Sequence, residues 1–362
     1  MSVRVQVELG ERAYPVVVGA GGLDQTGHQI VDLGRPGPLL VVTDETVARL
    51  WRPRLEAALE VTGAAGWGPI SWLELPPGEP HKNLEQVTRI WERGLDLGAD
   101  RQLLIVAFGG GVVGDMAGFA AATLLRGVRL LMLPTTLLAQ VDSSVGGKTG
   151  FNSAQGKNLI GAFHQPSAVI ADLAVLRTLP ERDFRAGFAE IIKIAAVQDE
   201  ELFDRLYVHA PALLAQEPAA LAEVVARCCA LKAAVVAADE REAGARQLLN
   251  FGHTVGHAIE KLGAYSRWRH GEAVAMGMIA AARIGAAAGV ADEGVHDRLL
   301  ALVARFGLPT APPPDTDRAA LIAAMGFDKK RRGGAIRWIL CPRIGHWVGH
   351  ELTAEEAVAA LD

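Results

Sequence analysis

Short apolar runs alternate with amphipathic stretches through the first half of the chain. Val3–Val7 and Ala13–Val18, on either side of Gly10-Glu11-Arg12, predict a β-hairpin. The apolar pattern predicts buried strands over Leu39–Thr43, Leu103–Phe108, Leu130–Leu133 and Ala168–Ile170, and a helix over Val47–Leu59. Strands that alternate with helices predict a mostly parallel sheet with both faces covered.

The pattern changes near Thr178-Leu179-Pro180, and from there to about Gly307 apolar residues recur at helical spacing. Helices are expected over Leu202–His209, ended or kinked before Pro211, over Ala219–Ala238, and as a buried helix through Ala280–Val290. Ala335–Val348 suggests a terminal hairpin packed on the helices. We therefore predict an α/β domain over residues 1–178 and a mainly α-helical domain over residues 179–362.

Composition and charge narrow the class of protein. Half of the residues are hydrophobic, 21% are charged, and the formal net charge is −5. A mildly acidic chain argues against a nucleic-acid or anionic-membrane surface, so an anionic substrate would need a local basic pocket. The three cysteines form no C-x-x-C motif. No apolar run reaches the ~18 residues of a membrane span. The N-terminus alternates apolar and polar residues, which is typical of a strand and not of a signal peptide. We expect a cytoplasmic protein with reduced thiols.

A glycine cluster, Gly109–Asp115, follows the predicted strand 103–108. Glycines at a strand end allow backbone N–H groups to approach a pyrophosphate, and the start of the next helix favours an anion. The cluster departs from G-x-G-x-x-G and has no acidic residue at the usual offset, so an ordinary tight turn remains an equal reading. Asp44, at the end of the first buried strand, is an alternative ribose contact, together with Glu79 and Lys82.

A second cluster, Pro134–Thr149, continues to Gly156-Lys157-Asn158. Its hydroxyls, glycines and two lysines suit recognition of a phosphate or a polyol. Apolar residues are interleaved with them, so we expect the stretch to be half buried, and a buried Lys148 would need an anionic partner. The alternative is a polar surface loop.

Histidines and a glutamate in the second half suggest a metal site. Glu190, His253 and His270 would supply a carboxylate and two imidazoles and leave a position open for substrate. His253 and His257 share one face if their segment is helical. Thr254 stands where a zincin has its glutamate, which argues against a metalloprotease. Spacing alone leaves structural histidines as an equal possibility, and zinc, cobalt or iron would suit the donors.

Basic and amide side chains near this set are candidates for binding a substrate phosphate and carboxylate. They are Lys232, Arg246, Asn250, His257 and Lys329-Lys330. Lys329–Arg332 is equally typical of a solvated charge run.

The chain resembles the 3-dehydroquinate synthases from about Asp44 to its C-terminus. The likeness rests on Leu125–Val128, Pro134–Thr149, Gly156–Phe163, Asn250–His257 and His270–Val274. It implies a nucleotide-binding α/β domain with a helical metal-binding domain, as in the iron-containing alcohol dehydrogenases. It also implies conversion of 3-deoxy-D-arabino-heptulosonate 7-phosphate to 3-dehydroquinate and phosphate, with NAD regenerated in each turnover and a divalent metal, Zn or Co.

The resemblance also implies residue roles. Glu190, His253 and His270 would bind the metal. NAD would be bound by Asp44, Glu79, Lys82, Gly111, Val112, Val113, Gly114, Asp115, Thr135, Thr136, Asp142, Lys148, Lys157, Val175, Leu176, Arg177 and Thr178. Catalysis would involve Lys148, Lys193, Arg246, Asn250 and His257, and substrate would also contact Asn158, Lys232 and one of Lys329 or Lys330. Arg126 would reach the phosphate site of a neighbouring subunit, which implies a homodimer.

Two departures from the family pattern leave alternatives open. Ile194-Ala195-Ala196 follows Lys193 where an aromatic residue and glycine are more usual, and Thr46 stands where an amide is sometimes found. The alternatives are an aminodehydroquinate synthase, another sugar phosphate cyclase such as an inosose or valiolone synthase, a metal-dependent polyol dehydrogenase that releases NADH, and a non-catalytic nucleotide-binding or scaffold protein.

Overall fold

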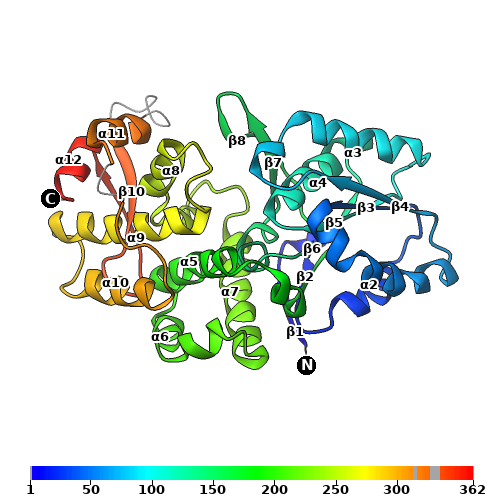
Figure 1. Cartoon of the computed structure of the whole chain (residues 1–362), viewed down its shortest axis with the longest axis horizontal. Helices are drawn as coiled ribbons and strands as arrows, with labels where there is room; N and C mark the ends of the chain where they lie inside the picture. The colour runs from blue at the N-terminus through cyan, green and yellow to red at the C-terminus, as the bar shows by residue number, and fades with distance from the viewer. Residues whose placement is uncertain (1, 313–315, 327–334, 362) are drawn as a thin grey trace. The chain divides into compact units, whose positions relative to one another are not determined.

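The alternating apolar runs of the first half form a seven-stranded sheet in the computed structural model (Figure 1). The structure describes residues 2–312, 316–326 and 335–361. Two units divide the chain: one holds the residues up to Pro180 together with Leu221–Arg241, and the other holds Glu181–Ala220 and the residues from Glu242 onward. A segment of the second half in sequence thus folds with the sheet.

The sheet is parallel except at one edge. Its strands are β1 (Ser2–Val7), β2 (Tyr14–Gly19), β3 (Leu39–Asp44), β4 (Ile70–Leu75), β5 (Leu104–Gly109), β6 (Arg129–Pro134) and β9 (Ala168–Asp172). They lie in the order β1-β2-β9-β6-β5-β3-β4. β1 pairs antiparallel with β2, with Ser2 opposite Gly19, which confirms the predicted hairpin. The other neighbours are parallel.

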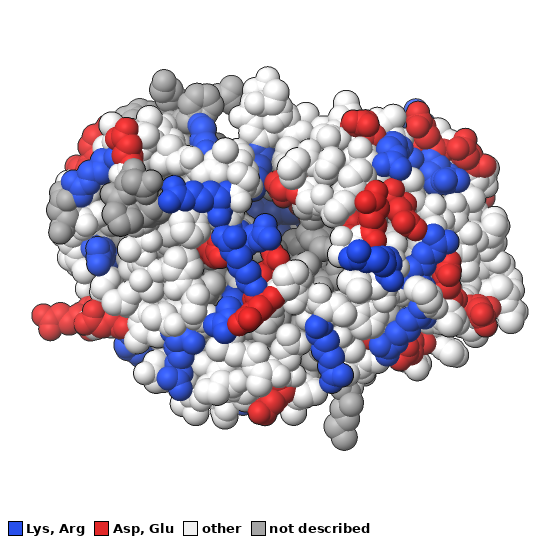
Figure 2. Space-filling view, in the orientation of Figure 1, with Lys and Arg blue, Asp and Glu red and all other residues white. Residues whose placement is uncertain are grey.

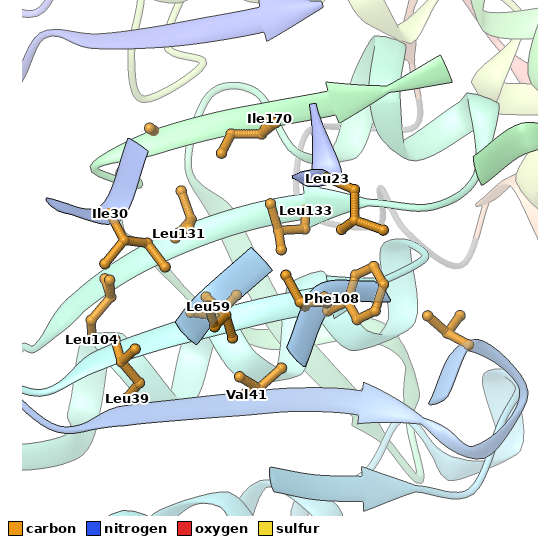
Figure 3. Packing of buried hydrophobic residues seen from close by; sticks show 14 of the residues in the cluster. Leu23, Ile30, Leu39, Val41, Leu59, Leu104, Phe108, Leu131, Leu133 and Ile170 are labelled. Carbon is orange, nitrogen blue, oxygen red and sulfur yellow. The ribbon is translucent and has the colours of Figure 1, made fainter. Parts of the chain in front are cut away.

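Helices cover both faces of this sheet, as the continuous apolar runs predict. They are α1 (Thr26–Asp32), α2 (Glu45–Ala64), α3 (Leu84–Asp96) and α4 (Gly111–Thr123). The part of α7 (Pro218–Ala238) from Leu221 onward also belongs to this unit. Figure 3 shows one layer of the core, where alternate residues of β3, β5 and β6 pack with Ile30 of α1 and Leu59 of α2. The predicted helix Val47–Leu59 is confirmed within the longer α2.

The strand order contains a switch point between β3 and β5. From β3 the chain passes to β4 on one side and then returns to β5 on the other. Open α/β sheets bind ligands at the carboxyl ends of the strands beside such a point. Asp44 ends β3 and Gly109 ends β5, so the topology brings two predicted nucleotide contacts to this crevice.

A hairpin that the sequence pattern did not predict follows in the first unit. β7 (Lys148–Ser153) pairs antiparallel with β8 (Gly156–Phe163), and Lys148 lies opposite Phe163. Short helical turns complete the unit: η1 (Gly10–Arg12), η2 (Leu23–Gln25), η3 (Glu79–His81), η4 (Leu124–Arg126), η5 (Ala139–Ser143) and η6 (Leu173–Thr178).

The second unit is mainly helical, as predicted. It contains α5 (Glu181–Gln198), α6 (Glu200–Leu214), η7 (Ala245–Asn250), α8 (His253–Leu262), α9 (His270–Ala287), α10 (Val295–Arg305), α11 (Arg318–Gly326), β10 (Ile336–Leu340), β11 (Val348–Leu352) and α12 (Ala354–Ala359). β10 and β11 form a terminal hairpin as predicted, but β11 begins only at Val348, where the predicted range ends, and β10 lies against α9. α9 also packs against α5, α8 and α10.

The helix predicted to end or kink before Pro211 does not end there, because α6 continues to Leu214. A kink at Pro211 stays a prediction. Proline removes the hydrogen bond to the carbonyl four residues earlier, here that of Tyr207. Tyr207 is 45% exposed, so that side of the helix faces solvent, where water can replace the lost bond. α7 agrees with the predicted Ala219–Ala238, and α9 contains most of the buried helix expected over Ala280–Val290.

Charges of both signs are interspersed on the surface. Figure 2 shows Lys and Arg side chains among Asp and Glu side chains over the visible face. Many of them pair, such as Arg52 with Glu56 and Glu74 at 2.8 Å each, and Arg54 with Asp24 at 2.6 Å. This distribution agrees with the small net charge of the chain.

Candidate functional site

The three predicted metal ligands converge in the second unit. Glu190 comes from the middle of α5, whereas His253 and His270 are the first residues of α8 and α9. Glu190 Oε1 lies 3.7 Å from His253 Nε2 and 3.4 Å from His270 Nε2. Donors about 2.0–2.2 Å from a tetrahedral metal stand roughly 3.3–3.6 Å apart. The three atoms, all within 4.8 Å of one another, therefore fit one divalent cation.

Glycines allow these helices to approach closely enough. A Cβ on Gly271 would stand 1.9 Å from the carbonyl oxygen of Ala186, and a Cβ on Gly277 would stand 2.0 Å from that of Gly252. Ala186 and Glu190 are one turn apart on α5 and share a face. Because Gly271 follows His270 directly, its contact with Ala186 places the His270 end of α9 beside Glu190.

The charges around Glu190 are strongly coupled. Glu190 and Lys193 are each 2% exposed, and Lys193 Nζ forms an ion pair with Glu190 Oε2. Burial, reinforced by the Lys193 ammonium, lowers the pKa of His253 to about 3. Burial alone would also lower the pKa of His270, but its hydrogen bonds with Glu190 and Glu260 raise that pKa to about 10. These shifts favour an uncharged His253 at neutral pH, whereas the two carboxylates favour a protonated His270.

α8 carries further polar groups on the face of His253. The His257 ring centroid lies 5.2 Å from that of His253 and 6.1 Å from that of His270. Glu260 Oε2 lies 3.1 Å from His270 Nδ1. His257, Glu260 and His270 also have donor atoms within 4.8 Å of one another. The sequence reasoning missed Glu260, although its spacing from His253 and His257 places it on the same helical face.

Two residues predicted to bind the substrate, Arg246 and Asn250, lie on η7. Arg246 is 1% exposed, and a buried guanidinium is a strong anion partner. Asn250 Nδ2 donates to Glu242 Oε1 at 2.8 Å. Glu242 has a φ of 59°, an uncommon value for a non-glycine residue that is often found at functional sites, and the sequence reasoning missed it. The predicted contacts Lys329 and Lys330 lie outside the described residues.

The glycine cluster begins a helix at the switch point of the first unit. Gly110 caps α4, and Gly111, Val112, Val113 and Gly114 form its first turn. A Cβ on Gly110 would stand 3.0 Å from Thr136 Cγ2, and one on Gly111 would stand 3.1 Å from Ser143 Oγ. The glycine cluster and the Pro134–Thr149 stretch thus form one surface, at which an anion would meet the N-terminus of α4.

Asp44 is held as the N-cap of α2. Its Oδ1 accepts from Thr46 N at 2.9 Å and Val47 N at 3.0 Å. Burial raises the pKa of the Asp44 carboxyl above its ordinary value, and these backbone hydrogen bonds oppose the rise. The predicted segment Val175–Thr178 belongs to η6, where Thr178 Oγ1 accepts from Trp51 Nε1 at 2.9 Å.

Lys82 is the centre of a polar network beside the β7–β8 hairpin. Its Nζ lies 2.5 Å from both Asp115 Oδ2 and Asn158 Oδ1. Burial raises the pKa of the Asp115 carboxyl, and the Lys82 ammonium opposes that rise. Glu79 Oε1 accepts from Asn152 Nδ2 at 2.8 Å and lies 3.8 Å from Lys157 Nζ. Asn158, predicted to contact substrate, therefore belongs to the same network as residues predicted to contact NAD.

Two other predicted contacts are also brought together. Lys232, expected at the substrate, has its Nζ 2.5 Å from both the backbone oxygen and Oδ1 of Asp142, expected at NAD. Arg126 follows Leu125 in a turn where both have positive φ, 65° and 51°.

The burial expected for Lys148 is wrong. Thr135, Gln140 and Ser144 are buried, but Lys148 is exposed. Lys148 begins β7 in a two-stranded hairpin, where the apolar pattern upstream no longer determines burial.

Comparison with known proteins gives the family. Residues 72–186 match the 3-dehydroquinate synthase N-terminal family, and residues 187–331 match the 3-dehydroquinate synthase C-terminal family. A 3-dehydroquinate synthase from Halorhodospira halophila is 49% identical over 358 residues, which cover 98% of this chain and 96% of the relative. The chain belongs to the 3-dehydroquinate synthase family. The family predicted from the sequence motifs is thereby confirmed, and the protein is an enzyme.

Solved structures show the same fold. A 2-epi-5-epi-valiolone synthase from Streptomyces hygroscopicus with NAD+ and Zn2+ bound superposes with a TM-score of 0.86 at 30% identity, covering 96% of this chain and 95% of that one. A 2-deoxy-scyllo-inosose synthase with carbaglucose-6-phosphate, NAD+ and Co2+ gives 0.85 at 27% identity, covering 99% of each chain. A probable glycerol dehydrogenase from Sinorhizobium meliloti, with a TM-score of 0.65 and 17% identity over 94% of each chain, shares the fold alone. The predicted fold class is confirmed.

The described helices of this chain include none that is both long enough and apolar enough to cross a membrane.

Proposed function

We propose that this enzyme converts 3-deoxy-D-arabino-heptulosonate 7-phosphate to 3-dehydroquinate and phosphate, as a phosphate-eliminating carbon–oxygen lyase. The observation that carries the proposal is the convergence of Glu190, His253 and His270 in a chain whose curated relatives are named 3-dehydroquinate synthases. A buried carboxylate and two imidazoles suit Zn2+ or Co2+, and the fold relatives carry these ions with NAD+.

The second unit would hold the metal, and the first would hold NAD+. Bound metal would acidify a substrate hydroxyl, and NAD+ would accept a hydride and return it. The glycine turn at the start of α4 would receive the pyrophosphate. The other proposed NAD+ contacts are Asp44, Glu79, Lys82, Asp115, Thr135, Thr136, Asp142, Lys148, Lys157 and Val175–Thr178.

Residues of this chain would orient the substrate and move its protons. His257 would relay a proton, because its imidazole is exposed beside the metal ligands without being one of the proposed three. Lys148 would stabilise negative charge that develops on the substrate. Lys193, Arg246 and Asn250 would bind the reacting substrate, with further contacts from Asn158, Lys232 and one of Lys329 or Lys330.

Two broader properties belong to the same proposal. Arg126 would reach the phosphate site of a second copy of the chain, so we propose a homodimer whose phosphate site needs both subunits. We also propose a cytoplasmic location, which agrees with three free cysteines among the described residues, all buried. Sedimentation of the purified protein would test the dimer.

Another sugar phosphate cyclase is the main alternative. The valiolone and inosose synthases superpose closely, but they are 27–30% identical to this chain, compared with 45–49% for the relatives named 3-dehydroquinate synthase. An aminodehydroquinate synthase differs only in its substrate. A polyol dehydrogenase would release NADH, which separates it experimentally.

The test combines the enzyme with heptulosonate phosphate, Zn2+ or Co2+, and substoichiometric NAD+. We expect equal amounts of phosphate and dehydroquinate with no net NADH. Accumulating NADH would favour the dehydrogenase, and turnover only of an amino analogue or of another sugar phosphate would favour the other cyclases.

Glu190→Gln should abolish turnover and metal retention, whereas Glu181→Gln, on the exposed side of the same helix, should retain both.

A further inference from the structure

Each proposed histidine ligand presents the same ring nitrogen to Glu190. His253 and His270 both direct Nε2 toward Glu190 Oε1, at 3.7 Å and 3.4 Å. Their Nδ1 atoms face different acceptors. His253 Nδ1 lies 3.2 Å from the backbone oxygen of Phe251, and His270 Nδ1 lies 3.1 Å from Glu260 Oε2.

An acceptor at Nδ1 determines which nitrogen of a neutral imidazole holds the proton. If Nδ1–H donates to an oxygen, the lone pair is on Nε2, where a metal can bind it. For His253 the acceptor is fixed by the backbone two residues away. For His270 it is a side chain on another helix, so the orientation of this ring depends on Glu260.

Glu260 is itself held in place by the fold. It lies near the end of α8, and its side chain is 3% exposed, whereas the next two residues, Lys261 and Leu262, are exposed. Burying a carboxylate is costly without hydrogen-bonding or charged partners. His270 supplies one, so the buried position of Glu260 and the orientation of the His270 ring support each other.

His270 needs such support more than His253 does. It is the first residue of α9, after the loop 263–269, and its side chain is 32% exposed, compared with 12% for His253. Packing therefore restricts the His270 ring less. A carboxylate that accepts from Nδ1 would both fix the ring and make Nε2 a better electron donor.

We propose that Glu260 is a positioning residue that holds His270 with Nε2 directed at the metal position beside Glu190. This proposal rests on the proposed metal centre and adds a residue that acts through a ligand. In this proposal Glu260 does not bind the metal, because its Oε2 faces His270 Nδ1, whereas the proposed metal position lies beside His270 Nε2.

The experiment measures Co2+ binding to metal-free protein in competition with a chelator, together with the visible spectrum of the bound cobalt. We expect Glu260→Ala to weaken Co2+ binding by about 10–100-fold. Glu260→Gln, which keeps the shape and one acceptor oxygen, should bind more tightly than Glu260→Ala. When saturated with Co2+, the Glu260→Gln variant should have an absorption maximum shifted from that of the wild type, because the carboxylate charge next to His270 Nδ1 is lost. Lys261→Gln, on the exposed side of α8, is the matched control and should match the wild type in both measurements.

The outcomes separate the two proposals. If the wild type does not bind Co2+, the metal centre itself is wrong. If the wild type binds and both Glu260 variants match it in affinity and spectrum, the positioning role is wrong. A result in which His257→Ala loses Co2+ but Glu190→Ala keeps it would place the metal among His257, Glu260 and His270, and would also overturn the positioning role. Thermal melting of each metal-free variant shows whether α8 and α9 remain folded.

Discussion

Gly271 lies against the backbone of Ala186 so closely that a Cβ on it would stand 1.9 Å from the Ala186 carbonyl oxygen. This contact brings the first turn of α9 to α5 at the level of Glu190. The donor atoms of Glu190 and His270 are consequently 3.4 Å apart, although they lie on helices well separated in sequence. A small residue beside a ligand thus sets the distance between two ligands.

Gly271→Ala should therefore weaken metal binding while leaving all three ligands in the chain. The added methyl group must push α9 from α5, which would separate Glu190 Oε1 from His270 Nε2, and overpacking of this kind typically costs about 1–3 kcal/mol. We expect at least a tenfold loss of Co2+ affinity, measured by chelator competition. Gly285→Ala is the control on the same helix, since its Cβ would stand 3.3 Å from its nearest neighbour, the Cβ of Ala291. Equal metal affinity in the two variants would contradict this account.

His257→Ala should reduce turnover and keep the metal. The His257 ring lies near the rings of both proposed histidine ligands. The donor set that contains buried Glu190 consists of Glu190, His253 and His270, and does not include His257. Loss of a proton-transfer group typically lowers kcat by about 10²–10⁴-fold. Metal content per chain, measured by elemental analysis, should equal that of the wild type. A metal-free His257→Ala protein would refute the assignment.

Lys82 and Asp115 should be energetically coupled. Lys82 is 4% exposed, and its ammonium contacts the Asp115 carboxylate at 2.5 Å. Asp115→Asn removes the charge of the partner, so we expect the free energy of unfolding to fall by about 1–3 kcal/mol. The double change Lys82→Met with Asp115→Asn should cost less than the sum of the same two single changes, because Lys82→Met removes the ammonium that Asp115→Asn leaves without its charged partner. Denaturant unfolding of the four proteins measures the coupling, and additive effects would show that the pair is not coupled.

The ion pair of Arg12 with Glu240 should make stability depend on acid pH. Arg12 Nη1 and Nη2 donate to the two Glu240 oxygens at 2.5 Å and 2.7 Å, and this hydrogen bonding lowers the pKa of Glu240 from 4.5 to about 2. A carboxyl with a depressed folded-state pKa stabilises the fold fully above its unfolded pKa, and that contribution disappears as the pH falls through the folded pKa.

Glu240→Gln should therefore be less stable than the wild type at neutral pH, by up to about 1 kcal/mol for a pair that is partly exposed. The difference should shrink between pH 4.5 and about pH 2. Unfolding in denaturant with a chelator present, at several pH values, measures it. Glu11→Gln changes an exposed carboxylate beside Arg12 and is the control. A difference that does not change over this pH range would rule out the linkage.

Local periodicity was sufficient to predict most elements of the fold. Continuous apolar runs predicted β3, β5, β6 and β9, because a strand covered on both faces has no polar side. The spacing of His253 and His257 predicted a shared helical face, and motifs predicted the family. Of the two outcomes expected at Pro211, a helix end or a kink, the helix end is wrong, because the rule for proline considers the lost hydrogen bond but not whether solvent can replace it.

The sequence by itself determined most of the secondary structure, the candidate metal ligands and the family. Only the tertiary structure decided that Leu221–Arg241 folds with the sheet, that Lys148 is exposed, that Lys82 contacts Asn158, and that Glu260 stands behind His270. The physical reason is the separation along the sequence of the residues that determine each feature. Helical and strand periods are set by neighbouring residues, whereas these four features depend on which distant elements meet and how closely glycines such as Gly271 allow them to approach.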